Sequence, residues 1–331
     1  MVKVSIIVAA YNVEKYIERC MDSLVNQTLS DIEIIVVNDG STDSTLNILN
    51  RYKKNDSRIV IVDKQNAGLI EARKSGLDEA RGEYLLFVDG DDWIDINTAE
   101  VLYNKASKDN LDIVCYNLCH AYDTWIKSMD MYDFGIATGL EYLKLVLLNK
   151  VRANIVLQFL KREFILYNKI EFPSNITYAE DLAITVTLAC NSPKVGSLYK
   201  TLYYYYQREN SVTQQVSEKV FDVEIAINII EEALKNKGIY EEYYNEFEYL
   251  MFIHLYYHRV IAVRYLGKIH KELYNRWVSK RVDLKTNEYY REFIKTIPFK
   301  ERFKIELYNI NYTLGNIYNR MYNLMIKLLR R

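Results

Sequence analysis

The stretch LLFVDGDDWI, residues 85–94, runs an apolar segment directly into three aspartates packed around one glycine. Its first four residues are typical of a buried strand, whereas Asp89, Asp91 and Asp92 repel one another. Such a cluster is best tolerated where a divalent cation or a donor-rich ligand shares the space. The alternative is a solvated turn whose aspartates cap the following helix. The stretch alone does not decide between a ligand site and a cap.

This segment is the last of four apolar runs that alternate with segments of helical period. The alternation is typical of an α/β protein with an open sheet built from βα units. Because the runs are apolar nearly throughout, we expect helices on both faces of a parallel sheet. The predicted strands cover residues 3–10, 32–39, 58–64 and 83–90, and the predicted helices run from Ile17 to Leu24 and from about Ala67 to Gly82.

Polar residues stand at the carboxyl ends of the predicted strands, among them Tyr11, Asp39, Lys64 and Asp89. Ligands in open α/β sheets bind outside these ends, so we expect the four tips to line one crevice. Tyr11 offers an aromatic face on which a nucleobase can stack. We expect the Asp39 carboxylate to face the crevice, where it can accept a hydrogen bond from a nucleobase imide. The strand tips therefore indicate a nucleotide site.

Composition and missing motifs exclude several classes of function. The 331 residues contain 43 Lys and Arg against 44 Asp and Glu, so nothing favours a nucleic-acid partner. The four cysteines lack CxxC spacing and indicate reduced thiols in a cytoplasmic protein. We expect neither a secretion signal nor a transmembrane segment. GxGxxG, GxxxxGK[ST], HExxH and GxSxG are all absent, which leaves the carboxylates as the candidate chemistry.

The composition changes after about residue 215, where long, tyrosine-rich helical patterns begin. We therefore divide the chain into a first region, residues 1–215, and a helical region, residues 216–331. In the helical region, one apolar stripe is expected from Val216 to Leu234.

The end of the helical region carries a heptad-type apolar seam, from Phe303 to Leu328. Basic residues flank this seam. Three alternatives stay open: a helix that docks on its own chain, the seam of a homodimer, or a helix that lies on an anionic membrane surface. The basic residues are Lys300, Arg302, Lys304, Arg320, Lys327, Arg330 and Arg331.

Four motifs in the first 95 residues together resemble the family 2 glycosyltransferases. They are VAAYN from residue 8, VNDGSTDST from residue 37, NAGLIEARKSGL from residue 66 and LLFVDGDDW from residue 85. The resemblance continues more loosely through ITYAEDLAITVTLA and YYYYQRENSVT. It implies the A-type glycosyltransferase fold, which is a mostly parallel Rossmann-like sheet flanked by helices, here with a helical C-terminal extension. It also implies a nucleotide-sugar donor, most often a UDP-sugar. Residues 1–215 would then be the nucleotide-sugar-binding catalytic domain, with a donor half of about residues 1–110 and an acceptor half of about residues 111–215.

The resemblance implies how the donor would be held. Tyr11 and Asp39 would bind the uracil, with Arg73 nearby, and Arg208 would approach the diphosphate. Asp89, followed by Gly90 in the donor site, would face the ribose or the metal. A divalent metal, Mn²⁺ or Mg²⁺, would be bound mainly by Asp91 and also by Asp89. This assignment leaves Asp92 as a helix cap.

The acidic pair Glu180 and Asp181 matches the motif in which the aspartate is usually the general base, with Glu180 as second choice. A carboxylate there would remove the proton of the acceptor hydroxyl, while a metal stabilises the departing diphosphate on the opposite side. The ordinary alternative is that acidic residues at a helix start interact favourably with the helix dipole.

We therefore expect a cytoplasmic, inverting, metal-dependent glycosyltransferase of bacterial surface-polysaccharide synthesis, with a glycan acceptor that the family often holds on a lipid. A membrane-peripheral location at the inner face of the cell membrane would suit such an acceptor. One rival is a sugar-nucleotide nucleotidyltransferase, but VAAYNVEKYI lacks the glycine-rich basic loop that it needs. The other is a donor-binding scaffold without turnover. It is suggested by residues 153–164, which lack the family's usual Trp and Lys and carry Gln158 near the lysine position.

Overall fold

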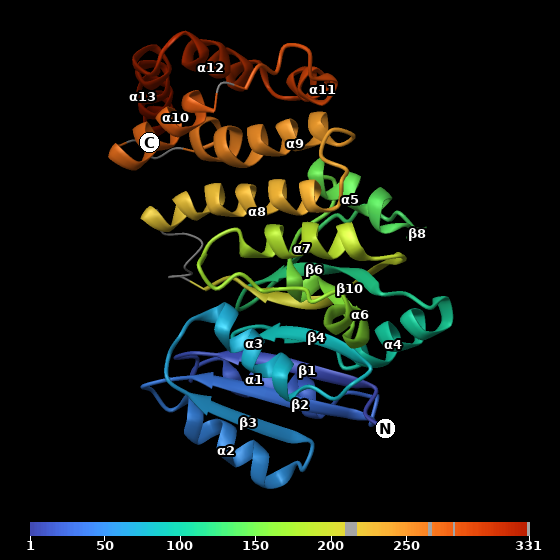
Figure 1. The fold of residues 1–331 in the computed structure, drawn as a ribbon. Coiled ribbons are helices and arrows are strands. Elements are labelled where there is room, and N and C mark those ends of the chain that lie inside the picture. The colour runs from blue at the N-terminus through green and yellow to red at the C-terminus, as the bar shows by residue number, and fades with distance from the viewer. Residues whose placement is uncertain (209–216, 264–266, 281, 330–331) are drawn as a thin grey trace. The chain divides into compact units, whose positions relative to one another are not determined.

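The computed structural model describes residues 1–208, 217–263, 267–280 and 282–329 (Figure 1). The chain divides into two compact units. The first comprises Met1–Val146 and Lys150–Gln215, and the second comprises Leu147–Asn149 and Val216–Arg331.

One mixed sheet forms the centre of the first unit, in the strand order β3-β2-β1-β4-β9-β6-β10-β5, with β7 beside β6 and β8 beside β10. Strands β1 to β4 are parallel, and β9 lies antiparallel between β4 and β6. This arrangement confirms the predicted fold class. The strands are β1 Val4–Ala10, β2 Ile32–Asp39, β3 Ile59–Lys64, β4 Tyr84–Asp89, β5 Trp93–Ile94, β6 Ile113–Ala121, β7 Ile126–Ser128, β8 Ile136–Ala137, β9 Gln158–Lys161 and β10 Val195–Tyr206.

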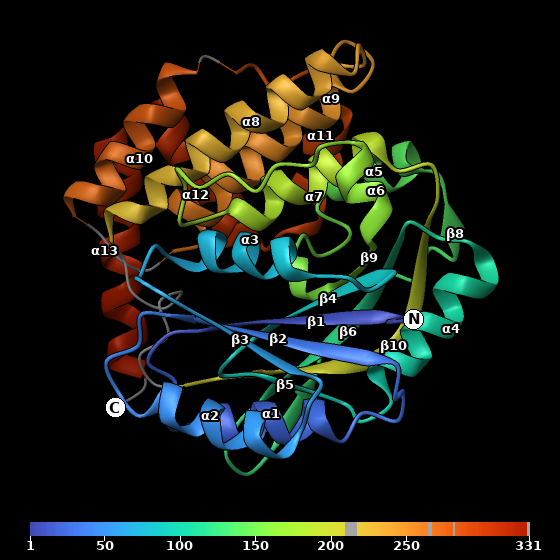
Figure 2. The ribbon, with the colours of Figure 1, turned by 60° about the horizontal axis from the view of Figure 1, so that its bottom comes forward.

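Helices cover both faces of the sheet, as Figure 2 shows for α1 and α2 on one face and α3 on the other. Strand β2 is therefore buried along its whole length. The apolar stripe of α1 is buried as predicted, because it packs under the sheet. The helices of this unit are α1 Ile17–Val25, α2 Thr45–Asn55, α3 Leu69–Glu79, α4 Thr98–Asp109, α5 Gly139–Leu147, η1 Ile155–Leu157, α6 Arg162–Tyr167 and α7 Glu180–Asn191.

Helix α3 is shorter at both ends than the predicted helix, which ran from about Ala67 to Gly82. At its start, the backbone N–H groups of Ala67 and Gly68 donate to the Asp39 carboxylate. At its end, the N–H of Arg81 donates to Glu33 at 2.6 Å. Carboxylates from β2 thus hold the flanking backbone outside the helix, which no local sequence signal indicated.

The described part of the second unit is helical. Val220, Val223, Ile227, Ile230 and Leu234 form a buried stripe, as predicted, whereas Val216 lies outside the described residues. Its helices are η3 Glu218–Phe221, α8 Asp222–Asn236, α9 Tyr244–Met251, the π-helix η4 Phe252–Ile261, α10 Lys268–Ser279, α11 Glu288–Thr296, α12 Phe299–Ile310 and α13 Tyr312–Leu329. None of these described helices, nor those of the first unit, is long and apolar enough to cross a membrane.

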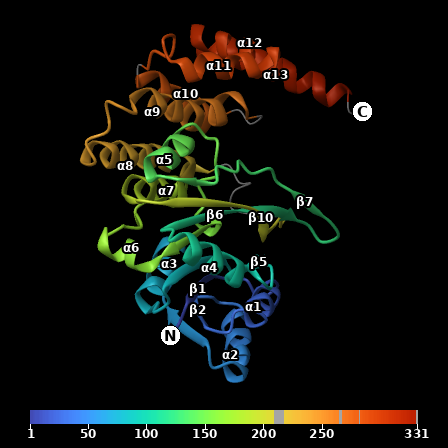
Figure 3. The same ribbon diagram turned by 90° about the vertical axis from the view of Figure 1, so that its right-hand side faces the viewer.

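The expectation of a single helix along the terminal seam is wrong. Asn311 is extended and separates α12 from α13, which lie side by side (Figure 3). The rings of Phe303 and Tyr318 are 5.3 Å apart, and Lys300 lies over the ring of Tyr322. These contacts pair the start of α12 with the middle and end of α13, so the two helices form an antiparallel hairpin.

Candidate functional site

A buried arginine joins the two acidic motifs of the first unit. Arg73 on α3 is only 3% exposed. Its guanidinium donates to Asp89 at 3.0 Å and to Asp181 at 3.1 Å, although Asp181 lies 108 residues away in the sequence. Burial lowers the pKa of Arg73, but the two carboxylates more than offset this effect and raise it. The guanidinium therefore stays charged and brings the end of β4 to the start of α7.

The Asp181 carboxylate is held from three directions. Besides the ion pair with Arg73, it accepts a hydrogen bond from the Asn154 amide at 3.5 Å and one from the backbone N–H of Ile155. Burial raises the pKa of Asp181, and the Arg73 charge limits the rise. This combination makes a carboxylate that is more basic than an ordinary aspartate and is fixed in orientation.

Glu180 stands beside Asp181 in the first turn of α7, after Ala179 in a left-handed conformation with φ of 67°. Burial, together with the neighbouring Asp181 charge, raises the pKa of Glu180 to about 7. Two adjacent carboxyl groups with raised pKa values are suited to proton transfer near neutral pH.

The three aspartates at the end of β4 have different partners: two pair with separate arginines, and the third accepts hydrogen bonds from β10. Asp89 pairs with Arg73, and Asp91 pairs with Arg208 at 3.1 Å, with the Asp91 side chain 20% exposed. Burial raises the pKa of Asp91, and the nearby Asp89 charge adds to the rise. The buried Asp92 accepts hydrogen bonds from the Tyr203 hydroxyl at 2.7 Å and from the backbone N–H of Tyr206 at 2.8 Å.

The prediction of Asp92 as a helix cap is therefore wrong. Helix α4 begins at Thr98 after Asn97, and Asp92 instead ties β10 to the loop that follows β4. This attachment brings Arg208, two residues beyond the end of β10, to Asp91. The solvated-turn interpretation of the aspartate cluster falls with it.

Gly90 permits a close backbone approach. Its N–H donates to the carbonyl oxygen of Ala9 at 2.9 Å. A Cβ at Gly90 would lie 3.0 Å from that oxygen and 3.2 Å from a methyl group of Val13, so a side chain would push the loop away from β1. The glycine thus keeps the aspartates close to the tip of β1.

The two residues predicted to bind a nucleobase lie at the same edge of the sheet. Tyr11 follows β1 and is 49% exposed, so its ring is accessible for stacking. Asp39 ends β2 but is only 3% exposed, and its two oxygens accept the N–H groups of Ala67 and Gly68 at 3.0 and 2.8 Å. The expectation that its carboxylate faces an open crevice is therefore wrong in this structure, because the loop before α3 covers it.

Several residues of the site were missed. Asn154 gave no signal, because a single asparagine in an apolar segment points to no role. Tyr203 and Tyr206 lie in the YYYY run, whose fourfold repeat could have suggested ordered hydroxyl groups. Arg73 was predicted to lie near the uracil of the donor. In the structure its guanidinium instead pairs with both Asp89 and Asp181.

The described residues contain no group of three or more His, Cys, Asp or Glu side chains that could hold a metal ion. Asp91 and Asp89 nevertheless suit Mg²⁺ or Mn²⁺, which bind oxygen ligands and keep much of their shell for substrate phosphates. Arg208 supplies the positive charge at Asp91 in this structure. The carboxylate oxygens of Asp89 and Asp91 thus fit a metal ion whose other ligands come from a bound substrate phosphate and water, and not a metal enclosed by protein ligands alone.

We predict that Arg73→Gln lowers the free energy of unfolding at pH 7.5 by about 3 kcal/mol, because breaking a buried ion pair leaves uncompensated charge. The loss shrinks at acid pH, where Asp181, whose pKa is raised by burial, becomes protonated. Urea denaturation at pH 5 and pH 7.5 measures both values. The control is Lys74→Gln on the same helix, which removes an exposed pair with Glu71 and should cost under about 0.5 kcal/mol. Equal losses in the two variants would contradict the assignment.

Glu180→Gln should stabilise the protein at alkaline pH. Because the folded pKa of Glu180, about 7, lies above the unfolded value of 4.5, its stabilising contribution is complete below pH 4.5 and is lost as the pH rises through 7. The variant lacks this loss, so we expect it to match wild type near pH 4.5 and to exceed it by roughly 1 to 3 kcal/mol at pH 8. Stability curves that stay parallel across this range would show that Glu180 titrates normally.

Comparison with known proteins agrees with the geometry. Residues 5–168 match the model of the family described as Glycosyl transferase family 2. The putative glycosyltransferase EpsH of Bacillus subtilis is 32% identical over 257 residues, which cover 76% of this chain and 74% of that protein. The cholesterol galactosyltransferase of Borreliella burgdorferi is 34% identical over 267 residues, which cover 77% and 74%.

A crystal structure of S. aureus TarS residues 1–349 in complex with UDP has a similar fold, with a TM-score of 0.62 at 22% identity. The similarity covers 92% of this chain and 78% of that one. The sequence motifs, the fold and these relatives agree. The chain is a glycosyltransferase and belongs to glycosyl transferase family 2.

Proposed function

We propose that this enzyme is an inverting, metal-dependent glycosyltransferase that moves a sugar from a UDP-sugar to a hydroxyl of a growing bacterial cell-surface glycan. The observation that carries the proposal is the ion-pair cluster in which Arg73 brings Asp181 next to Asp89. Relatives support the substrate class. The poly(ribitol-phosphate) beta-glucosyltransferase of Bacillus spizizenii is 33% identical over 228 residues, and TarS has been crystallised with UDP-GlcNAc.

In this proposal the donor binds along the carboxyl edge of the sheet. Tyr11 stacks on the uracil. Asp39 Oδ1 already accepts from Ala67 and pairs with Lys64 at 3.5 Å. Asp39 Oδ2, which accepts from Gly68, then accepts from the imide with its remaining lone pair after the loop before α3 adjusts. Arg208 exchanges its contact with Asp91 for one with the diphosphate. Asp91 and Asp89 would hold the divalent metal, which when bound neutralises charge on the leaving diphosphate.

Asp181 is the general base of the proposed reaction. It accepts the proton of the acceptor hydroxyl as that oxygen bonds to the anomeric carbon, while the bond from that carbon to the diphosphate oxygen breaks on the opposite face. The configuration of the sugar is therefore inverted. Arg73 keeps Asp181 ionised before the reaction, and Asn154 fixes the second carboxylate oxygen. Glu180 is the second candidate, because its pKa of about 7 also suits a base.

The altered segment 153–164 does not favour a scaffold without turnover. Gln158, near the expected lysine, is buried and donates to Thr185 at 2.8 Å and to Tyr142 at 3.3 Å. It is therefore part of the core, whereas Asn154 and Ile155 of the same segment hold Asp181. These contacts support an intact catalytic centre.

Two substitutions separate donor binding from chemistry. We expect Asp91→Asn to weaken UDP binding in MnCl₂ at least about tenfold, a loss of roughly 1.4 kcal/mol. Asp181→Asn should bind UDP within about twofold of wild type, but should lower kcat by about 10² to 10⁴ for loss of general base catalysis. Calorimetry gives the affinities, and UDP release from UDP-sugars gives the rates. Asp31→Asn, exposed at the amino end of β2, is the control. The proposal fails if wild type with Mn²⁺ binds neither UDP nor any UDP-sugar.

We further propose that the α12–α13 hairpin contacts an anionic membrane surface. One face of α13 packs on α12 through Tyr318 and Gly315. The other face bears an apolar stripe whose side chains are 40% to 66% exposed. This outer stripe consists of Leu314, Ile317, Met321, Leu324 and Leu328.

Charge favours a lipid surface over a second copy of the chain. Residues 299–331 contain seven basic residues and only two acidic ones. Each Lys or Arg near an anionic membrane contributes about 1 kcal/mol, whereas a second copy would present the same positive charge and be repelled. A peripheral contact of this kind would place the enzyme beside a lipid-linked acceptor.

Replacing both Ile317 and Leu324 with Gln should lower co-sedimentation with vesicles containing phosphatidylglycerol at least about tenfold at low salt, because two exposed aliphatic side chains that would enter the membrane are lost. Val278→Gln, which removes an exposed apolar side chain from α10, is the matched control and should change nothing. Unchanged sedimentation of the double variant would contradict the membrane contact. A switch from dimer to monomer in ultracentrifugation would instead identify a second copy as the partner.

A further inference from the structure

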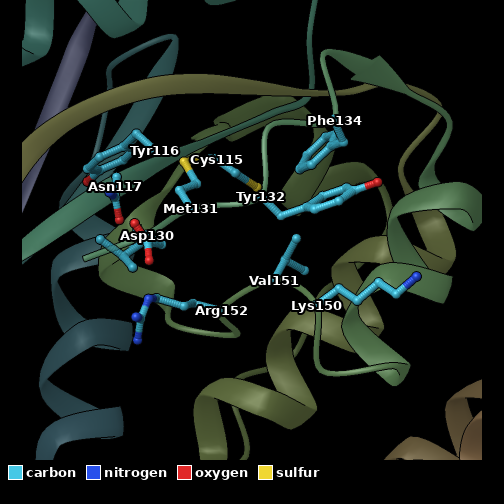
Figure 4. Close-up of a pocket in the computed structure, with 11 residues that line it drawn as sticks. Cys115, Tyr116, Asn117, Asp130, Met131, Tyr132, Phe134, Lys150, Val151 and Arg152 are labelled. Carbon is cyan, nitrogen blue, oxygen red and sulfur yellow. The ribbon is translucent and has the colours of Figure 1, made fainter. Parts of the chain in front are cut away.

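A hollow opens in the acceptor half of the first unit (Figure 4). Its internal volume is about 40 Å³, and it opens to solvent. Its walls come from β6, from residues 130–134 and from residues 150–152, and none of the described donor-site residues lines it. Tyr132, which is exposed, and Phe134, which is half-buried, offer apolar surface to a sugar ring, whereas Tyr116 is buried in the wall.

The segment beside the hollow also holds the proposed base. Arg152 lines the hollow, and two residues later Asn154 donates to the Asp181 carboxylate. Tyr116, on the wall, donates its hydroxyl to the carbonyl of Val156 at 2.5 Å and so fixes this segment against β6. Strand β9 is antiparallel to β4 and β6, so the residues that precede β9 lie at the edge of the sheet where β4 and β6 end. Asn154 and Ile155, which hold Asp181, are among these residues. An acceptor whose hydroxyl reaches Asp181 is thus placed next to the hollow.

Arg152 brings a positive charge to the hollow. Within the described residues, no carboxylate lies at ion-pair distance from it, and Asp130 acts on it only from farther away. Arg152 is exposed at the rim of the hollow, and its partial burial there lowers its pKa. Lys150 lines the same hollow. With two cations against the single anion Asp130, the lining is positive overall.

The positive charge of Arg152 also acts on β6, which forms one wall of the hollow. After burial itself, the charges of Arg152 and Lys127 lower the pKa of His120 on β6. An exposed guanidinium with no carboxylate at ion-pair distance in the part of the chain that the structure describes is available to a ligand oxyanion, which it can bind through two parallel hydrogen bonds. Asp130 would then accept hydrogen bonds from sugar hydroxyl groups. Its negative charge would repel a ligand that carries a second anionic group on that side.

We propose that this hollow is the acceptor subsite and that Arg152 selects an acceptor unit bearing an oxyanion, either a carboxylate or a phosphate, next to the hydroxyl that reacts. The inference rests on the proposed transfer reaction and adds its acceptor class. Arg152 is then a specificity-determining residue, and it has no part in donor binding.

The test uses three small probes on the full chain saturated with UDP and Mn²⁺: methyl glucuronide for a carboxylate, glycerol phosphate for a phosphate, and methyl glucoside as the neutral compound. Dissociation constants come from ligand-observed NMR. We expect wild type to bind at least one anionic probe more tightly than the neutral one, and the better anion identifies the acceptor group. Arg152→Gln should weaken anion binding about tenfold, as expected for a charge-assisted hydrogen bond at a partly exposed site.

Two controls accompany the test. Arg152→Lys, which keeps the charge but loses the paired hydrogen bonds, should retain part of the anion preference. Arg51→Gln removes an exposed arginine of α2 that pairs with Glu18 of α1. This variant should leave all three affinities unchanged. UDP affinity should stay within about twofold in every variant, because Arg152 does not line the donor site.

Equal affinity of wild type for charged and neutral probes, or an Arg152→Gln variant that keeps the anion preference, would overturn the proposal while leaving the donor chemistry intact. Failure of wild type to bind UDP would instead defeat the underlying function. With the true acceptor, Arg152→Gln should raise KM with little change in kcat, and a fall in kcat alone would also contradict a role in acceptor binding.

Discussion

The positive charge of Arg73 is the constraint on which the rest of this site depends. A buried guanidinium is tolerated only where carboxylates and hydrogen bonds replace its hydration, because dehydrating an ion costs several kcal/mol. Arg73 meets this condition with Asp89 from β4 and Asp181 from α7. The same contacts set a donor-side carboxylate beside the proposed base. One structural requirement thereby fixes the relative position of the two carboxylates that the proposal assigns to metal binding and to base catalysis.

The remaining aspartates depend on this arrangement. With Asp89 committed to Arg73, Asp91 is left to Arg208, and Asp92 is enclosed by the tyrosines of β10. Asp92 positions Arg208 through the backbone of β10. The aspartate cluster, whose charges repel one another, therefore connects the end of β4 to the end of β10. The protein's own cations and hydroxyl groups balance the charge that a metal diphosphate would also balance.

The sheet could be predicted from the sequence because its strands are apolar on both faces, a pattern with few alternatives. The stripe of α1 was equally clear. The ends of α3 could not be predicted, since Asp39 and Glu33 hold its flanks from a distant strand. Asp92 was assigned to a cap for the same reason: its partners, Tyr203 and Tyr206, are more than a hundred residues away. Local patterns report periodicity, whereas the site is built from contacts between distant segments.

A double-mutant cycle between Asp89→Asn and Asp181→Asn tests the central claim most directly. Each single variant leaves Arg73 one carboxylate, whereas the double variant leaves none. The free energy of unfolding of the double variant should therefore fall below the additive value by at least about 1 kcal/mol, as for residues that share one ion-pair network. Losses that add within about 0.5 kcal/mol would mean that Arg73 does not couple the donor carboxylate to the base.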